Sequence, residues 1–343
     1  MDPRVVARTF VEAVDPVIPL ILQEDGGIWT GEAHVARHVK GDGSPVTAVD
    51  VATQAVIVHR LRQRLENIPI VGEENDSSLA ALSPRERDRV RALVGAAAGE
   101  GAASRVGEML GRQADGPSPR SYVAIDPIDG TKGFVGGGHY AVCLAWVHDG
   151  RARVGLVVAP RLDAGANVDV IEGRAPHGTA FLAVDGRLEV ADVVDGRIGT
   201  FRSVAETRRA EPTEVALVAT SRASGHTDPR IVEELARAFG RPVRAVRIDG
   251  QGKYGLVATG RVDAYVRVPR TPRQEPVWDH APGLALVDAA GLAAGDARGR
   301  PFDLRRPPYV GDARGVVVAP PSSFDAIVAV TRRRVEGDGS QDP

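Results

Sequence analysis

The stretch AIDPIDGTKGF, residues 124–134, places Asp126 and Asp129 three residues apart, in a turn at the end of an apolar run. Gly130 and Thr131 follow and indicate the start of a helix, where free backbone N–H groups bind anions and a glycine permits close approach. Carboxylates repel a phosphate, so the two are compatible only if a positive charge lies between them. The stretch therefore predicts a site for a cation and a phosphate together.

Other carboxylates stand in similar places along the chain. They follow short apolar runs or lie at expected helix starts: Asp50, Glu73, Glu74 and Asp279. In α/β folds ligands gather at strand ends, and carboxylates that converge there without Lys or Arg partners repel one another. A divalent cation resolves this repulsion, and oxygen-only ligands favour Mg²⁺, which shares its shell with water and substrate phosphate. The pattern predicts a Mg²⁺ site.

Each acid also has a purely structural interpretation. Asp50 lies three residues after Thr47, which is the spacing of a helix capping box. Asp129 and Asp279 precede expected helices and fit N-caps, while the adjacent Glu73 and Glu74 fit a solvated strand end. No single residue decides between the interpretations, but the acids occur together and in similar local contexts, which favours a site.

Composition limits the class of protein. The chain has 343 residues, of which 43% are apolar, and a net charge of −2, which argues against a nucleic-acid partner or a membrane-surface protein. The single cysteine, Cys143, has no partner for an internal disulfide, in keeping with a reducing compartment. The first residues lack the apolar core of a signal peptide, and no apolar run is long enough to span a bilayer. These features predict a cytoplasmic protein.

Hydrophobic periodicity predicts two kinds of organisation. In the first part of the chain we expect a helix over 4–23 interrupted at Pro16 and Pro19, a helix from Thr47 and surface helices over 84–112. We also expect strands at 68–72 and 121–125, and a hairpin over 140–160 that turns at 148–150. After residue 211, strands expected at 214–220, 243–249 and 262–268 alternate with helices at 228–240, 253–261 and 279–291. The polar stretch 331–343 is expected to fray.

Four motifs together resemble a known family. They are SPVTAVD (44–50), VGEE (71–74), DPIDGTKGF (126–134) and WDHAPG (278–283). The chain resembles the lithium-sensitive, magnesium-dependent phosphatases of the inositol monophosphatase superfamily, and within it the 3'(2'),5'-bisphosphate nucleotidases. The likeness covers roughly residues 40–320 and is weak over 84–120 and 161–210.

The resemblance implies a role for each matching residue. The metal ligands would be Glu73, Asp126, Asp129, Asp279 and the backbone carbonyl of Ile128, holding two or three Mg²⁺ in a site inhibited by Li⁺. The pair that orients and deprotonates the attacking water would be Asp50 and Thr131. The transferred phosphate would lie on Gly130 and Thr131. The rest of a nucleotide would contact His226, Gly250, Lys253 and Arg267.

The resemblance also implies a fold and a reaction. The fold would be the layered α/β/α/β/α sugar-phosphatase architecture, with an α+β metal-binding part over 1–210, an α/β part over 211–335 that completes the site, and a flexible tail over 336–343. The reaction would remove the 3'-phosphate from adenosine 3',5'-bisphosphate or its 5'-phosphosulfate form. An inositol or sugar monophosphate is the alternative substrate. A non-catalytic nucleotide-binding protein is a third hypothesis, which would not need Asp50 and Thr131. Oligomeric state stays open.

Three departures from the nucleotidase pattern bear on the substrate, one of which is that Ser221, Arg222 and Ala223 resemble only loosely the family's segment before its histidine. After Phe134 the chain continues VGGGHY, where these nucleotidases usually carry an Arg and a Glu around one glycine. Gly250 stands where a serine commonly contacts the nucleotide, so we expect a backbone N–H to substitute for its hydroxyl. The acids are intact, so phosphate-ester hydrolysis is a firmer expectation than the identity of the substrate.

Overall fold

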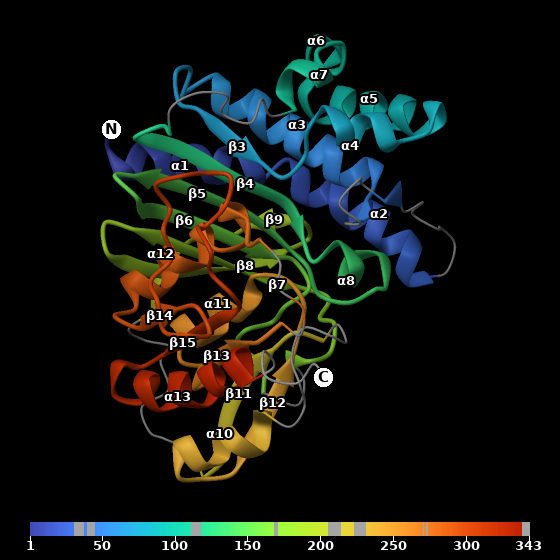
Figure 1. The fold of residues 1–343 in the computed structure, drawn as a ribbon. Helices are drawn as coiled ribbons and strands as arrows, with labels where there is room; N and C mark the ends of the chain where they lie inside the picture. Colours follow the sequence, from blue (N-terminus) through green and yellow to red (C-terminus); the bar gives the residue numbers. More distant parts are fainter. Residues whose placement is uncertain are drawn as a thin grey trace, which may run out of the picture.

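Two β-sheets alternate with three layers of helices in the computed structural model, which describes residues 1–30, 38–39, 45–110, 118–167, 171–204, 214–222, 231–269, 271 and 274–337. Helices near the N-terminus cover one face of the larger sheet, α11 and α12 lie between the sheets, and α10 and α13 cover the smaller sheet (Figure 1). This order confirms the layered α/β/α/β/α architecture expected from the sequence.

The first helical layer is built from the N-terminal third of the chain. Its helices are α1 (Pro3–Val14), α2 (Val17–Thr30), α3 (Ala48–Arg62), α4 (Asp76–Ala81), α5 (Pro84–Ala98), α6 (Glu100–Ala103) and α7 (Val106–Met109). The expected interruption occurs after Asp15, at Pro16. Pro19 instead lies in the first turn of α2, where a missing backbone N–H costs no hydrogen bond.

The larger sheet has eight strands in the order β10-β8-β7-β6-β5-β4-β3, with β9 paired to β8. Its strands are β3 (Ile70–Gly72), β4 (Ser121–Asp129), β5 (Ala141–His148), β6 (Arg151–Ala159), β7 (Gly178–Val184), β8 (Arg187–Val194), β9 (Arg197–Ile198) and β10 (Arg202–Ser203). Only the β3–β4 pair is parallel. The predicted hairpin turn is confirmed between β5 and β6, with Asp149 and Gly150 at φ 50° and 71°.

The smaller sheet has five strands in the order β12-β11-β13-β15-β14, of which the first three are parallel. Its strands are β11 (Ala216–Thr220), β12 (Val243–Arg247), β13 (Ala264–Arg267), β14 (Ala293–Gly295) and β15 (Val316–Ala319). The remaining elements are β1 (His38–Val39), β2 (Pro45–Val46), α8 (Thr131–Val135), α10 (Ile231–Phe239), α11 (Gly252–Ala258), the 3₁₀ helix η2 (Val277–Asp279), α12 (Ala281–Ala289) and α13 (Pro321–Gly337). The strand–helix alternation predicted after residue 211 is confirmed.

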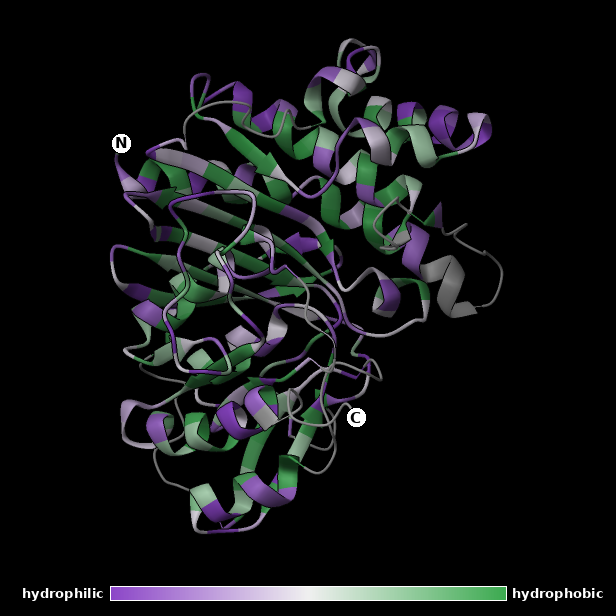
Figure 2. Ribbon diagram, in the orientation of Figure 1, coloured by the Kyte–Doolittle hydropathy of each residue, from purple (hydrophilic) through white to green (hydrophobic). Residues whose placement is uncertain are grey.

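Helix α12 lies against the larger sheet at van der Waals distance. A Cβ added at Gly155 of β6 would stand 2.4 Å from the Pro282 carbonyl oxygen, and one added at Gly283 would meet the ring of Tyr254 at 2.2 Å. The glycines therefore allow α11 and α12 to fill the space between the sheets. Figure 2 shows the hydrophobic colouring of the strands beside more hydrophilic outer helical turns. This packing brings the residues that precede α12 to β4.

The C-terminal region differs from the sequence prediction. The stretch after residue 331 was expected to fray, but α13 continues to Gly337. Thr331 is fully buried, and its hydroxyl donates a hydrogen bond to the Ala297 carbonyl oxygen at 2.8 Å. Tertiary packing of α13 on β15 and α10 thus overrides the polar composition up to Gly337. The division at residue 210 stays a prediction, although the two sheets fall on either side of it.

Candidate active site

Asp50 and Thr131, separated by 81 positions in the sequence, lie side by side. The Thr131 hydroxyl donates hydrogen bonds to Asp50 Oδ1 at 3.2 Å and to the Ile128 carbonyl oxygen at 3.1 Å. Asp50 is fully buried and Thr131 is 7% exposed. The fold therefore brings together the two residues that the sequence singled out for handling water.

The structural and the functional interpretation of Asp50 are compatible. Thr47 and Asp50 form the predicted capping box of α3, in which Asp50 Oδ2 accepts hydrogen bonds from the Thr47 backbone N–H at 2.9 Å and from its hydroxyl. Because capping occupies Oδ2, the other oxygen, Oδ1, faces Thr131. The cap holds the carboxylate in a single orientation.

Strand β4 carries Asp126 and Asp129 across a bulge. Asp126 pairs with Cys143 of β5 and Asp129 pairs with Ala141, with a shift of register between them. A bulge re-aims side chains next to a functional site. The α8 helix then begins after Gly130, so Gly130 and not Asp129 is the N-cap. The N-cap interpretation of Asp129 is wrong.

Glu73 reaches the same place from the parallel strand β3, because its backbone N–H donates to the Ile125 carbonyl oxygen at 3.1 Å. Gln54 of α3 fixes this strand end: its amide nitrogen donates to the Glu74 carbonyl oxygen at 2.5 Å, and its amide oxygen accepts from the Glu74 N–H at 2.9 Å. Glu74 is fully buried. The solvated-strand-end interpretation is therefore wrong for Glu74.

Asp279 is the last residue of η2, in the segment that leads into α12. The N-cap of α12 is His280, which makes no side-chain capping bond, so the N-cap interpretation of Asp279 is wrong as well. Gln251 orients this turn by donating to the Trp278 carbonyl oxygen at 2.9 Å and accepting from the Gly283 N–H at 3.2 Å. Sequence reasoning missed both Gln54 and Gln251. The available signal was a lone amide, within the mainly apolar stretch 51–58 for Gln54 and between two glycines for Gln251.

The acids perturb one another. Burial raises the pKa of Asp126 well above its ordinary value, and the charges of Glu73, Asp129 and Asp279 raise it further. Burial and the charge of Asp279 raise the pKa of Asp129 to about 7, although Lys253 and Arg267 pull it down. Such mutual effects require the four carboxylates to lie near one another in a site of low polarity.

The donor set fits a hard divalent cation. Every candidate ligand is an oxygen, and Asp126 Oδ1 is buried without a hydrogen-bond partner in the part of the chain that the structure describes. Within those same ranges, no three His, Cys, Asp or Glu side chains are already drawn together as a metal-binding group. The acids are near enough to raise one another's pKa, and a bound cation would offset their repulsion.

Gly130 and Gly250 bring the two sheets' loops into backbone contact. A Cβ at Gly130 would stand 3.0 Å from the Gly250 nitrogen, and a Cβ at Gly250 would stand 2.8 Å from the Asp129 carbonyl oxygen. Both residues have positive φ, 91° and 72°. The departure at Gly250 thus has a structural reason, because a serine there would collide with the motif.

Two predicted substrate contacts already have partners inside the protein. Lys253, 5% exposed, donates to the Gly250 carbonyl oxygen at 2.7 Å and the Ile248 carbonyl oxygen at 3.3 Å. Arg267, also 5% exposed, forms an ion pair with fully buried Glu275 at 2.8 Å. His226, the third predicted contact, lies outside the described residues.

Around Arg267 lies a polar network that the sequence did not reveal. His280 Nδ1 is 2.9 Å from the Tyr254 hydroxyl, and His280 Nε2 is 3.4 Å from Glu275. These contacts give His280 a structural role in the network. Glu275 was given no role from the sequence, although Gln274 and Glu275 before Trp278 belong to the pattern that resembles the nucleotidases.

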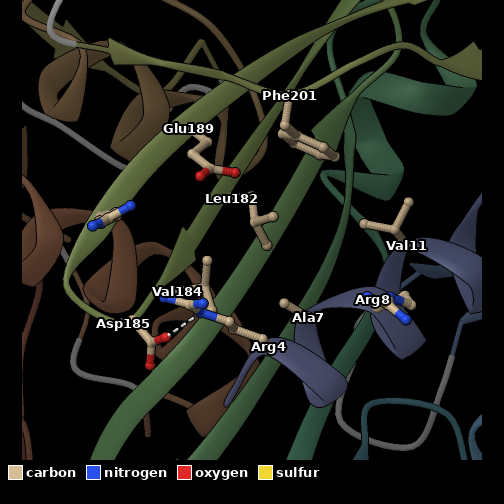
Figure 3. A pocket seen from close by; sticks show the side chains of 10 residues that line it. Arg4, Ala7, Arg8, Val11, Leu182, Val184, Asp185, Glu189 and Phe201 are labelled. Atoms are coloured by element: carbon tan, nitrogen blue, oxygen red, sulfur yellow. Dashed lines mark hydrogen bonds and ion pairs between the residues drawn. The ribbon is translucent and has the colours of Figure 1, made fainter. Parts of the chain in front are cut away.

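A separate pocket of about 410 Å³ lies between α1 and strands β7 and β8 (Figure 3). Its lining is apolar at Ala7, Val11 and Phe201, and Arg4 pairs with Asp185 at its rim. None of the predicted site residues lines it.

Among the described residues, no helix is long and apolar enough to cross a membrane.

Comparison with known proteins identifies relatives along nearly the whole chain. Residues 2–336 match the model of the inositol monophosphatase family. A 3'(2'),5'-bisphosphate nucleotidase of Emericella nidulans is 32% identical over 318 residues, covering 86% of this chain and 89% of the relative. The 3'(2'),5'-bisphosphate nucleotidase of Schizosaccharomyces pombe is 30% identical and covers 85% of both chains.

Solved structures share the fold at lower identity. Thermotoga maritima IMPase superposes with a TM-score of 0.59 at 19% identity, covering 95% of this chain and 96% of that one. CysQ from Bacteroides thetaiotaomicron, described as a bacterial member of the inositol monophosphatase family, superposes with a TM-score of 0.56 at 19% identity, covering 92% and 96%. At these identities the likeness concerns the fold alone.

Proposed function

The chain belongs to the inositol monophosphatase family, whose members are metal-dependent phosphatases that generally use Mg²⁺, and we propose that it removes the 3'-phosphate from adenosine 3',5'-bisphosphate. The observation that carries the proposal is the hydrogen bond from Thr131 to Asp50 beside four mutually perturbing acids. The substrate class comes from the nucleotidases that resemble the chain over most of its length.

In this proposal two or three Mg²⁺ ions are held by Glu73, Asp126, Asp129, Asp279 and the Ile128 carbonyl oxygen. When bound, Mg²⁺ would supply positive charge that offsets both the acids and the phosphate oxygens, and would favour ionisation of water. The Ile128 carbonyl oxygen already accepts from Thr131, and its second lone pair leaves room for a further partner. The loss of Asp126 or Asp129 would remove one of these oxygen ligands.

Asp50 and Thr131 would act on the attacking water. Asp50 Oδ2 is committed to the cap of α3, so Oδ1 is the oxygen that takes up a proton through the Thr131 hydroxyl. Thr131 in turn orients the water with its oxygen as acceptor. Because burial and the cap fix the carboxylate, little reorganisation accompanies the proton transfer.

The backbone at Gly130 and Gly250 would form the wall behind the transferred phosphate. Neither residue carries a side chain that would hold the ligand away, and the positive φ of each turn suits glycine. As substrate contacts, His226, Lys253 and Arg267 stay predictions from the resemblance. Li⁺ inhibition and a cytoplasmic location are further parts of the same proposal.

The test compares phosphate release from adenosine 3',5'-bisphosphate, its 5'-phosphosulfate form and inositol 1-phosphate, with Mg²⁺ and with added Li⁺. We expect fastest turnover of the bisphosphate or the phosphosulfate and inhibition by Li⁺. Faster turnover of inositol phosphate would overturn the nucleotide assignment and favour the monophosphate alternative. Nucleotide binding without any phosphate release would favour a non-catalytic binder.

Asp50→Asn and Thr131→Val test the water-handling pair directly. Each should lower kcat by about a hundredfold or more, because general-base assistance is lost while the acids remain. Thr131→Ser keeps the hydroxyl and is the matched control, which should retain most activity. Equal losses in Thr131→Val and Thr131→Ser would contradict the role of the hydroxyl.

A further inference from the structure

The connection between β14 and β15 leaves the smaller sheet and reaches the larger one. Residues 302–313 of this connection form a strap that lies against β4, where the Leu304 carbonyl oxygen accepts a hydrogen bond from the Tyr122 hydroxyl at 2.8 Å. Beside it, a Cβ added at Gly150, in the β5–β6 turn, would stand 2.5 Å from Cγ of Arg305. In Figure 1 this loop, coloured orange to red, crosses the strands of the larger sheet. The strap therefore joins the two sheets.

The middle of the strap pairs with the segment that leads to Asp279. The Val277 N–H donates to the Pro308 carbonyl oxygen at 2.8 Å, and the Val310 N–H donates to the Glu275 carbonyl oxygen at 2.9 Å. The residues between these two bonds form an antiparallel bridge. Backbone hydrogen bonds to the strap thus reach within two residues of this proposed metal ligand.

An apolar cluster lies between the strap and the larger sheet. It includes Val71 of β3, Tyr122 and Ala124 of β4, Val277 and Trp278 of η2, and Leu304 of the strap. One or two residues after the cluster members of β3, β4 and η2 come three proposed metal ligands, Glu73, Asp126 and Asp279. Because a buried cluster is close-packed, a shift of the strap is transmitted to the segments that carry these acids.

The Tyr122 hydroxyl and the Leu304 carbonyl group are both inside the protein, since Tyr122 is 1% exposed and Leu304 is 3% exposed. A buried carbonyl oxygen that loses its donor keeps the cost of its desolvation, so without the hydroxyl the strap gains from moving toward water. The charges of Glu73 and Asp279 act on Asp126. In the metal-free protein this repulsion favours the same outward movement, which the strap resists.

We propose that Tyr122 is a positioning residue for the metal site, whose hydrogen bond to Leu304 holds the strap on β4 and, through the strap, keeps Asp279 close to Asp126. In this role Tyr122 touches neither metal nor substrate. The proposal rests on the metal-dependent phosphatase function proposed above, but it concerns the affinity for the cation and not the choice of phosphate ester. Its consequence is a site that is assembled before Mg²⁺ binds, so that less ordering accompanies binding.

Thr331 provides a matched control. Its hydroxyl also donates to a carbonyl oxygen at 2.8 Å, that of Ala297, and Thr331 is fully buried as well. Ala297 lies in the same connection but outside the strap, in a different apolar cluster. Thr331→Val and Tyr122→Phe each remove one buried hydroxyl, so both should lower the unfolding temperature. If Tyr122 positions the metal site, only Tyr122→Phe should also weaken metal binding.

The experiment measures Mg²⁺ binding by calorimetry in the absence of substrate, for the wild type, Tyr122→Phe, Thr331→Val and Leu304→Ala. We expect Tyr122→Phe to weaken Mg²⁺ binding by about three- to tenfold, less than the loss of a group bonded directly to a ligand. Leu304→Ala, which removes the apolar anchor of the strap, should act in the same direction, and Thr331→Val should leave the affinity unchanged. The Mg²⁺ concentration that gives half-maximal phosphate release should shift by the same factors, while KM for the nucleotide at saturating Mg²⁺ stays that of the wild type.

An unchanged Mg²⁺ affinity in Tyr122→Phe would overturn the proposal, and so would wild-type affinity in Leu304→Ala. Equal losses of affinity in Tyr122→Phe and Thr331→Val would overturn it in favour of a general dependence on stability, which thermal unfolding in a chelator measures for each variant. A wild type that binds no Mg²⁺ would remove this inference together with the metal site. A wild type whose Mg²⁺ binding depends on Tyr122, but which releases no phosphate from the bisphosphate or from inositol 1-phosphate, would refute the proposed function and leave this inference standing.

Discussion

Acidic and basic residues share the space between the two sheets, but the fold treats them differently. Arg267 and Lys253 each have internal partners, a buried carboxylate in one case and backbone carbonyl groups in the other. The acids instead raise one another's pKa, and Asp126 keeps a buried oxygen without a hydrogen bond in the described residues. Arg267 Nε, like Asp126 Oδ1, is buried without a hydrogen bond in the described residues, so the difference lies in charge: the bases face opposite charge or carbonyl groups, whereas the acids face one another.

In the proposed function, this difference distinguishes charges that stabilise the fold from the acids that would hold metal. A buried charge that is paired contributes to a defined structure, while buried like charges cost stability until something offsets them. Proteins retain such unfavourable arrangements where they serve function. The comparison predicts that removing an acid and removing a partner of a base have opposite effects on stability.

The largest expected effect is the loss of activity in Asp126→Asn. The change keeps the shape of the side chain but removes the negative charge of a proposed metal ligand, so turnover should fall on the order of a thousandfold. Because repulsion is relieved, thermal unfolding in a chelator should shift to a higher temperature. Asp192→Asn, in an exposed ion pair with Arg202, is the control and should change neither. A less stable Asp126→Asn protein would break the comparison.

Glu275→Ala should act in the opposite direction on stability. It leaves the buried Arg267 without its carboxylate, which costs about 3–5 kcal/mol. Chemical denaturation with and without Mg²⁺ measures this cost. Asp312→Ala removes an exposed partner of Arg300 and should have little effect. A Glu275→Ala variant as stable as the wild type would show that Arg267 does not depend on this pair.

Without metal, stability should depend on pH through the acids. The pKa of Asp129 is about 7 in the folded protein, above its ordinary value near 4, so the folded state binds more protons between these values. Stability should therefore fall as pH rises from about 4 to about 7, by a few kcal/mol at most. Mg²⁺ should restore it above pH 7. Denaturation in chelator at pH 5 and pH 8 checks the sign, and greater metal-free stability at pH 8 would contradict it.

The smallest effect concerns the contact between the two loops. Gly250→Ser introduces a Cβ 2.8 Å from the Asp129 carbonyl oxygen at positive φ, so it should cost about 1–3 kcal/mol and lower turnover by moving the motif. Gly240→Ser is matched, since Gly240 also has positive φ but no atom within 4 Å of its Cβ position. It should lose less stability and no activity. Equal losses of activity would remove Gly250 from the site.

Much of the site could be predicted from local sequence. The acids stand at ends of apolar segments, which are the places where strands deliver ligands, and the capping box at Thr47 and Asp50 is a local pattern. Three local interpretations failed because each depends on neighbours: Asp129 and Asp279 are not N-caps, and Glu74 is buried because Gln54, twenty residues earlier, holds its backbone. The local sequence propensity of a residue does not include its contacts with residues far away in the chain.

The sequence by itself determined many of the helices and strands and the candidate acids, because hydrophobic periodicity and short motifs are local properties of the chain, and the layered fold followed from the resemblance to the family. Only the tertiary structure decided which charges are satisfied. It paired Arg267 with Glu275 and Arg174 with Asp25, and tied Lys253 to carbonyl groups. These pairings join residues from different segments, and the free energy of a buried charge depends on what surrounds it in space.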